Sequence, residues 1–326
     1  MPTTLRSLRF CEYVITTFVP GFLIPTDTPV RLSTTRGGIE KVSKEIENGR
    51  FSNGRLIPDM LASSLLHKDA IPAFLNANIS DKDLLTGVNF ASAGSGFDEN
   101  TNFVLNVLPP SKQLSNFGDY IKRLKKVVGK DKAKAILADS LVIISAGTND
   151  ISSEKMLFND TQYQYKLLNG MEHMVKEVHD MGCRSMIVGS LPPAGCLPIR
   201  MSLRFPNIAD RKCIDEQNAY AQSYNQKLAK LLPQLQSKLS GSKLVYADIY
   251  KPLMDMIKNP KEYGFVETKL GCCGTGLVEM GPLCNQFTML CDNDADYLFW
   301  DSIHPSQGAY KHIAQYILKH VLPKLQ

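Results

Sequence analysis

The 326-residue sequence lacks several features that would place it in other classes of protein. No apolar run reaches the roughly 20 residues that a membrane-spanning helix needs, so no membrane span is predicted. No linker rich in proline and serine divides the chain, and α/β folds often reach this length as one unit. The net charge is only +5, and the basic run at 122–134 is interrupted by leucine and valine without stacking aromatics. That run is typical of a solvated helix face, so nucleic-acid binding is not expected.

Cysteine, in contrast, is plentiful for a cytosolic enzyme, with eight residues. Six of them are disulfide candidates in two clusters: Cys196 with Cys213, then Cys272, Cys273, Cys284 and Cys291. The second cluster contains no C-x-x-C pair of zinc-finger type, so we expect no structural metal. N-glycosylation sequons at Asn78 and Asn159 agree with a secretory route. The apolar run 14–24 resembles a signal peptide only loosely, because Glu12 precedes it closely and Pro20 interrupts it.

Short apolar runs alternate with helical patterns along the chain. The apolar runs lie at 87–91, 141–145, 185–188 and 244–247. The helical patterns lie at 114–128, 165–181, 217–239 and 310–322. Continuous apolar runs are typical of strands that are buried on both faces of a parallel sheet. We therefore predict an α/β fold in which the loops at the carboxyl ends of the strands carry the chemistry.

The most informative motif is Asp-Ser-Ile-His-Pro at residues 301–305. On one helical or 3₁₀ turn, Asp301 can accept the Nδ1 proton of His304, fix its tautomer and stabilise the imidazolium that forms during acyl transfer. This pair is two thirds of a hydrolase triad. The other histidines have no such partner in the sequence and are predicted to be structural or surface residues: His67, His173, His179, His312 and His320.

Five sequence blocks occur in an order that is specific to one family. They are Gly-Arg-Phe-Ser-Asn-Gly-Arg at 49–55, Gly-Val-Asn-Phe-Ala-Ser-Ala-Gly-Ser-Gly at 87–96, Gly-Thr-Asn-Asp at 147–150, Leu-Pro-Pro-Ala-Gly-Cys at 191–196, and the motif at 301–305. From residue 48 to the end, the chain resembles the GDSL-type or SGNH ester hydrolases, and within them the secreted plant esterase/lipases. The resemblance implies a three-layer α/β sandwich with a flavodoxin-like parallel sheet and an extracellular location.

The resemblance also implies roles for individual residues. In this family, the serine of a Gly-Asp-Ser motif at the end of the first strand attacks the ester, and the histidine of the Asp-x-x-His block activates it. His304 matches that base and Asp301 its orienting partner. The amide of Gly94 and the side chain of Asn149 match donors to the oxyanion, each typically worth about 10² to 10³ in rate. Neither a metal nor an organic cofactor is implied.

The sequence departs from the family pattern at the nucleophile, because it contains no Gly-Asp-Ser triplet. Residues 1–47 match no family block, and we predict a non-family segment there, followed by a hydrolase domain at 48–326. The Asp-Ser pair at 139–140 precedes its strand, which is the wrong end for catalysis. The apolar run 13–19 is predicted to replace the lost first strand, which places Thr16 or Thr17 near the vacated nucleophile position.

Two functions therefore stay open on the sequence. One is an ester hydrolase of the GDSL type, acting on acyl or acetyl esters of lipids, cell-wall polysaccharides or small metabolites. The other is a relative without a nucleophile, or a truncated isoform, that at most binds ester or glycan ligands. In either case we expect a monomer.

Overall fold

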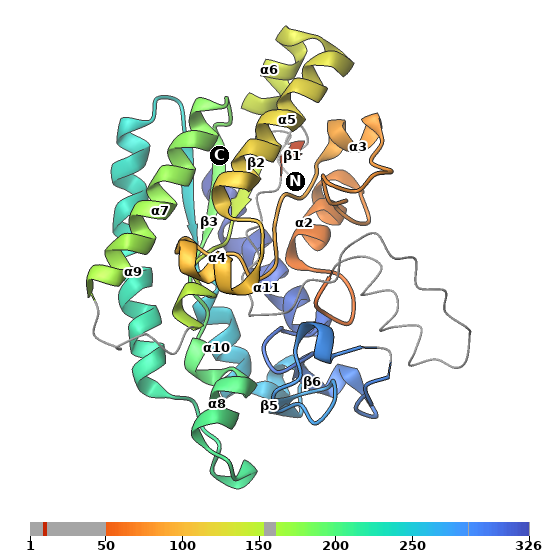
Figure 1. Ribbon diagram of the computed structural model, residues 1–326, viewed down its shortest axis with the longest axis vertical. Coiled ribbons are helices and arrows are strands. Elements are labelled where there is room, and N and C mark those ends of the chain that lie inside the picture. The colour runs from red at the N-terminus through yellow and green to blue at the C-terminus, as the bar shows by residue number, and fades with distance from the viewer. Residues whose placement is uncertain (1–8, 12–49, 153–160, 286, 326) are drawn as a thin grey trace.

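A parallel β-sheet lies at the centre of the part of the molecule that the computed structural model describes, residues 9–11, 50–152, 161–285 and 287–325 (Figure 1). Its strands follow the order β1-β2-β3-β4, and all three neighbouring pairs are parallel. The strands are β1 (Arg9–Cys11), β2 (Ser140–Ile144), β3 (Ser185–Gly189) and β4 (Lys243–Ala247). The predicted α/β class with a parallel sheet is confirmed, and β2 to β4 match the predicted apolar runs.

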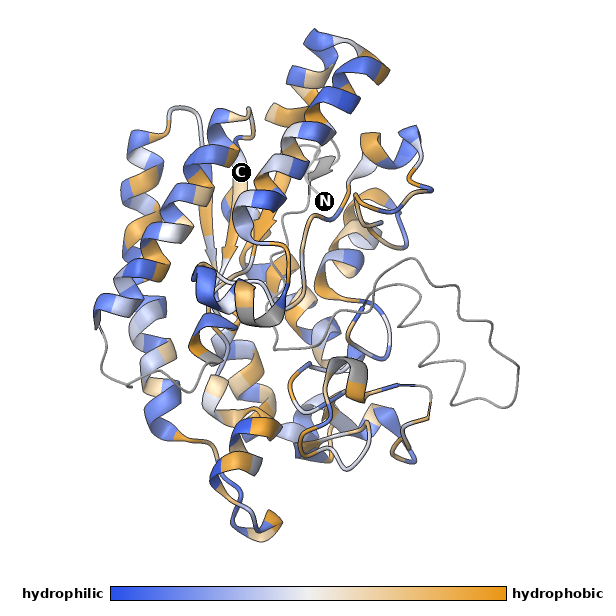
Figure 2. Ribbon diagram, in the orientation of Figure 1, coloured by the Kyte–Doolittle hydropathy of each residue, from blue (hydrophilic) through white to orange (hydrophobic). Residues whose placement is uncertain are grey.

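Helices cover both faces of this sheet. One face is covered by α5 (Pro110–Val128), α7 (Thr161–Asp180) and α9 (Asp215–Lys238). The other face is covered by α2 (Ile57–Leu66), α10 (Tyr250–Lys258) and α11 (Gln307–His320). Shorter helices lie in the connections: α3 (Asp81–Thr86), α4 (Glu99–Leu105), α6 (Lys130–Ala138) and α8 (Pro198–Arg204). The helices turn their apolar sides toward the sheet and their hydrophilic sides outward (Figure 2).

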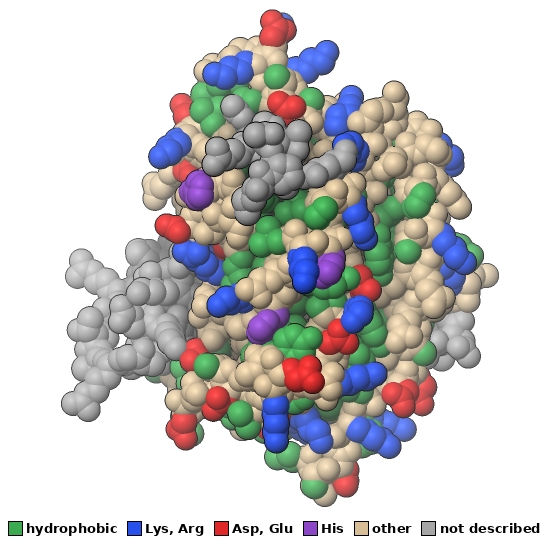
Figure 3. Space-filling view, turned by 180° about the vertical axis from the view of Figure 1, so that it is seen from behind, with side chains coloured by type: hydrophobic (Ala, Val, Ile, Leu, Met, Phe, Trp, Pro, Cys, Tyr) green, Lys and Arg blue, Asp and Glu red, His purple; other side chains and the backbone are tan. Residues whose placement is uncertain are grey.

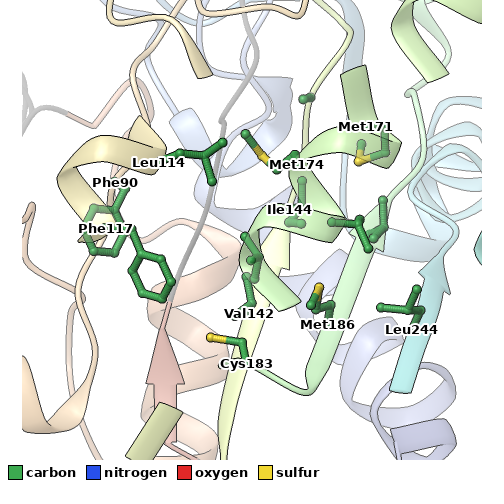
Figure 4. Close-up of a cluster of buried hydrophobic side chains, with 14 of the residues drawn as sticks. Phe90, Leu114, Phe117, Val142, Ile144, Met171, Met174, Cys183, Met186 and Leu244 are labelled. Atoms are coloured by element: carbon green, nitrogen blue, oxygen red, sulfur yellow. The ribbon is translucent and has the colours of Figure 1, made fainter. Parts of the chain in front are cut away.

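Each central strand divides its side chains between two hydrophobic cores. Val142 and Ile144 of β2 pack with Met186 of β3, below α5 and α7 (Figure 4). Leu141 and Ile143 point to the opposite face and pack with α2, α10 and α11. This alternation is the period of two that extended chains impose, and burial on both faces explains why the strands are apolar throughout.

A second, two-stranded parallel sheet positions the C-terminal motif. It pairs β5 (Glu267–Gly271) with β6 (Tyr297–Phe299), and residue 301 follows just after β6. The helix α11 begins directly after the motif, where the Ser306 hydroxyl accepts a hydrogen bond from the amide of Ala309. The motif is therefore held between a strand and a capped helix.

All six predicted cysteines lie in disulfides. The bonds are Cys196–Cys213, Cys272–Cys291 and Cys273–Cys284. The adjacent cysteines at the end of β5 thus tie two points of the loop 272–293 back to the edge of the small sheet.

One predicted strand does not form. Residues 87–91 make a single parallel bridge, between Asn89 and Ala73. The amide of Asn89 donates to the carbonyl of Pro72, and the carbonyl of Asn89 accepts the amide of Phe74. The Asn89 side chain accepts the amide of Ala91, which turns the chain away from an extended path. The predicted strand at 13–19 lies outside the described residues, as do nearly all residues on the amino side of the boundary predicted at 48.

The surface shows no concentration of one charge on the face seen from behind, where Lys and Arg side chains alternate with Asp and Glu (Figure 3). No helix in the described ranges is both long and apolar enough to span a membrane.

Candidate active site

Asp301 and His304 form a buried hydrogen-bonded pair. The Nδ1 atom of His304 lies 2.6 Å from Oδ2 of Asp301, and the two residues are only 6% and 1% exposed. Because an ionised carboxylate only accepts hydrogen bonds, this contact assigns the proton to Nδ1 and makes Nε2 the basic nitrogen. All six histidines lie in the described ranges, and His304 is the only one that is buried.

The turn around this pair differs from the helical or 3₁₀ turn that we predicted. Residues 301–304 form a bend, in which Oδ1 of Asp301 accepts the amides of Ile303 at 2.8 Å and His304 at 2.6 Å. One carboxylate thus folds the backbone with one oxygen and orients the imidazole with the other. Since the backbone amides are satisfied by the side chain, no helical hydrogen bond is needed to bring the two groups together.

Neighbouring segments hold this bend in place through backbone hydrogen bonds. The amide of Trp300 donates to the carbonyl of His304 at 2.8 Å. The amide of Ser302 donates to Glu279 in the disulfide-bonded loop at 2.8 Å, and the carbonyl of Ser302 accepts from Ile199 of α8 at 2.9 Å. A side chain at Gly271 would collide with the backbone of Asp301, so β5 can lie this close to the bend only because residue 271 is glycine.

The predicted oxyanion donors Gly94 and Asn149 lie in two loops that are bonded to each other. Gly94 has a φ of 83°, which a residue with a side chain rarely adopts. The Nδ2 atom of Asn149 donates to the carbonyl of Ser95 at 2.9 Å. This bond fixes the orientation of the Asn149 amide against the turn that contains Gly94.

Asp150 is a buried carboxylate that braces the same turn. Its two oxygens accept the amides of Phe97 and Asp98, both at 2.9 Å. A side chain at Gly96 would overlap this carboxylate, so the turn can close on it only with glycine there. Burial raises the pKa of Asp150 from 3.8 to about 6, against the opposing effect of these two amide hydrogen bonds.

Helix α8 connects the two parts of the candidate site. Its residue Ile199 donates to Ser302 beside His304, and the next residue, Arg200, donates from its guanidinium to the carbonyl of Ile151 at 3.1 Å. Ile151 lies in the 3₁₀ turn η2 (Asp150–Ser152) that follows Asn149. The Asp/His bend and the loop of the predicted oxyanion donor Asn149 therefore contact successive residues of one helix.

The sequence of the chain is similar to that of one protein family over most of its length. The model of the GDSL-like Lipase/Acylhydrolase family matches residues 33–317. The GDSL esterase/lipase At2g30310 of Arabidopsis thaliana is 47% identical over 278 residues, which cover 83% of this chain and 77% of that protein. The GDSL esterase/lipase At1g58430 of the same plant is 43% identical over 297 residues, which cover 89% of this chain and 82% of that protein. The chain belongs to the GDSL-like lipase/acylhydrolase family.

Members of this GDSL-like family are hydrolases of carboxylic esters, and two serines that stand in or near family-like sequences are engaged in local hydrogen bonds. Ser140 lies at the amino end of β2, where its hydroxyl donates to Ile136 at 2.6 Å. The hydroxyl of Ser52 donates to the carbonyl of Pro305 at 3.2 Å. Thr16 and Thr17 lie outside the described residues.

Of the two predicted glycosylation sites, only Asn78 lies among the described residues. Asn78 is exposed, and Ser80 of its sequon caps α3 by accepting the amide of Asp83. Asn159 lies outside the described residues. Asn78 thus has the accessibility that a glycan requires.

Two residues of this GDSL-like site were not identified from the sequence. The ring of Phe51 stacks on the imidazole of His304, with centroids 5.3 Å apart and planes at 15°. Asp150 supports the turn of Gly94, as described above. The only signal in the sequence was that both residues lie inside family blocks, at 49–55 and 147–150. The position of a residue in a block does not show which side chains it contacts.

Proposed function

We propose that this chain carries the acid–base and oxyanion machinery of a GDSL-type ester hydrolase. His304 is the general base and acid, Asp301 orients it, and Gly94 and Asn149 stabilise the oxyanion. In the reaction, Nε2 takes the proton of the attacking hydroxyl and returns it to the leaving alcohol, while Nδ1 keeps its hydrogen bond to Asp301.

The observation that carries this proposal is the 2.6 Å contact between Nδ1 of His304 and Oδ2 of Asp301. It gives the imidazole the tautomer that general-base catalysis of acyl transfer needs. The pair is also buried, and in a water-poor site the charge interaction between imidazolium and carboxylate is stronger than in solvent.

We propose further that the family nucleophile is absent from this chain. The support is the lack of any Gly-Asp-Ser triplet among the 326 residues. The parallel pairing of β1 with β2 supports the related inference that the amino-terminal segment supplies a substitute for the first strand of the family sheet. On this basis the second candidate function is a catalytically inactive relative that binds ester or glycan ligands.

The substrates that we propose are acyl or acetyl esters of lipids, polysaccharides or small metabolites, and the proposed location is extracellular. The three disulfides support an oxidising compartment, because such bonds form and persist there. The chemistry proposed for the site uses the side chains of Asp301, His304 and Asn149 together with the backbone amide of Gly94.

Labelling with a fluorophosphonate, followed by peptide mapping, tests the proposal on the purified chain. A serine or threonine hydroxyl that is activated by His304 reacts with the probe, and His304→Ala abolishes the reaction. Labelling of one hydroxyl that is lost in His304→Ala would establish an active esterase with a substitute nucleophile.

No labelling of a folded sample would support the inactive relative, in which the base has no attacking group to activate. Labelling that is unchanged in His304→Ala would contradict the role assigned to the base. A thermal melt of both proteins shows that each sample is folded.

A further inference from the structure

The block at 49–55 contacts the candidate base although it lies far from it in the sequence. Phe51 stacks on His304, with ring centroids 5.3 Å apart and an interplanar angle of 15°. Such stacking of flat rings fixes the plane of the imidazole, whereas the hydrogen bond to Asp301 fixes only the direction of Nδ1. Together, the two contacts define the orientation of the ring.

The residues beside Phe51 hold the chain on the carboxyl side of His304. The hydroxyl of Ser52 donates to Pro305 at 3.2 Å. The Oδ1 atom of Asn53 accepts the amide of Gln307 at 2.7 Å, and its Nδ2 atom donates to Asp294 at 2.8 Å. Consecutive residues thus contact the imidazole, the next residue after it and the first residue of α11.

The other end of this segment is anchored to α2. Arg50 binds Asp59 through two hydrogen bonds of 2.8 and 2.7 Å, and Asp59 also accepts the amides of Leu56 and Ile71. Asp59 is only 2% exposed, so this bidentate pair is shielded from solvent. Residues 50–53 therefore form a rigid bridge from α2 to the bend that carries His304.

We propose that Phe51 is a positioning residue for His304, and that residues 50–53 form a clamp that keeps the imidazole in the plane in which Nδ1 meets Asp301. This inference rests on the proposed function for what His304 does. The position of the ring itself is measurable without turnover.

Nuclear magnetic resonance of the histidine-labelled chain provides that measurement. We expect the wild-type protein to show a sharp downfield resonance from the Nδ1 proton, and we expect His304→Ala to lack it. In Phe51→Leu, the resonance broadens or disappears because the ring tilts and the proton exchanges with water. The nitrogen shifts of His304 then move from a single Nδ1–H tautomer toward a mixture of the two tautomers.

Two further variants separate positioning from packing. Phe51→Tyr keeps a stacked ring and should keep the resonance. Phe74→Leu removes a ring of similar partial burial from the aromatic contact with Phe90, away from His304, and should also keep it. Phe51→Met, which fills space without a flat ring, replaces Phe51→Leu if the latter does not fold.

Loss of the resonance in Phe51→Leu, with retention in Phe74→Leu, supports the inference. Retention in a folded Phe51→Leu overturns it, and so does an equal loss in Phe74→Leu. None of these outcomes depends on a nucleophile, so a failure of the ester-hydrolase proposal appears only in the fluorophosphonate experiment.

Discussion

Asp150 shows how one buried side chain can organise a loop of the candidate site although burial disfavours its charged form. Its oxygens hold the amides of Phe97 and Asp98, while burial raises its pKa from 3.8 to about 6. The folded protein therefore binds this proton more tightly than the unfolded chain. The stabilisation from proton binding is complete below about pH 4 and is lost as the pH rises through the folded-state value.

We predict that wild type loses stability relative to Asp150→Asn between about pH 4 and about pH 7. The loss is at most about 3 kcal/mol, at 1.36 kcal/mol per unit of pKa difference. At low pH, Asp150→Asn should be less stable than wild type, because an amide cannot accept both backbone amides with its two terminal atoms. Urea unfolding across this range measures the difference between the two proteins, and a difference that does not change with pH contradicts the prediction.

Single residues of the site were predictable where their partners are close in sequence. Asp301 and His304 are three positions apart, so a turn alone brings them together. The contact between Ser52 and Pro305 spans 253 positions, and the stacking of Phe51 on His304 comes with it. Such contacts depend on how α2 packs against α11, and no local pattern carries that information.

At the scale of elements, the disulfide between Cys196 and Cys213 closes a short segment that contains α8 and ends just before α9. Its sequence separation of 17 corresponds to about 3 kcal/mol in the chain-entropy account of disulfide stabilisation. We predict that Cys196→Ser/Cys213→Ser lowers the melting temperature by an amount that corresponds to this free energy. Calorimetry of the oxidised proteins measures it, and an unchanged melt would show that the bond does not stabilise the fold.

Strands were predictable from the sequence where both faces are buried. Residues 141–145, 185–188 and 244–247 are apolar because each strand faces two cores, and the strands formed within one residue of those positions. The run 87–91 is apolar for another reason, since Val88 and Phe90 pack under α5 without a strand partner along their length. Apolar character reports burial, whereas strand formation also requires a neighbour with free backbone groups.

At the scale of the whole molecule, the two cores share the sheet as their common wall. If one core is lost, the strands lose the packing on that face and can no longer support the core on the other face. The described parts should therefore unfold together. We predict that Met171→Ala in one core and Ile313→Ala in the other each cost about 2 to 5 kcal/mol. Both residues are at most 1% exposed.

Each of these two variants should also keep a single unfolding transition. Circular dichroism in the far and near ultraviolet should then give the same midpoint for each protein. Separate midpoints would mean that the two sides of the sheet unfold independently.

The single tryptophan of the chain lies beside the candidate site. Trp300 is 1% exposed and packs against the disulfide-bonded Cys272, Cys273 and Cys284, next to Asp301. An excited indole transfers an electron readily to a neighbouring disulfide, so its light emission in the folded, oxidised protein should be weak. Reduction of the two adjacent bonds removes the electron acceptor and brightens the protein. The tryptophan fluorescence of this molecule therefore reports on the disulfide-bonded loop that contacts the bend of His304.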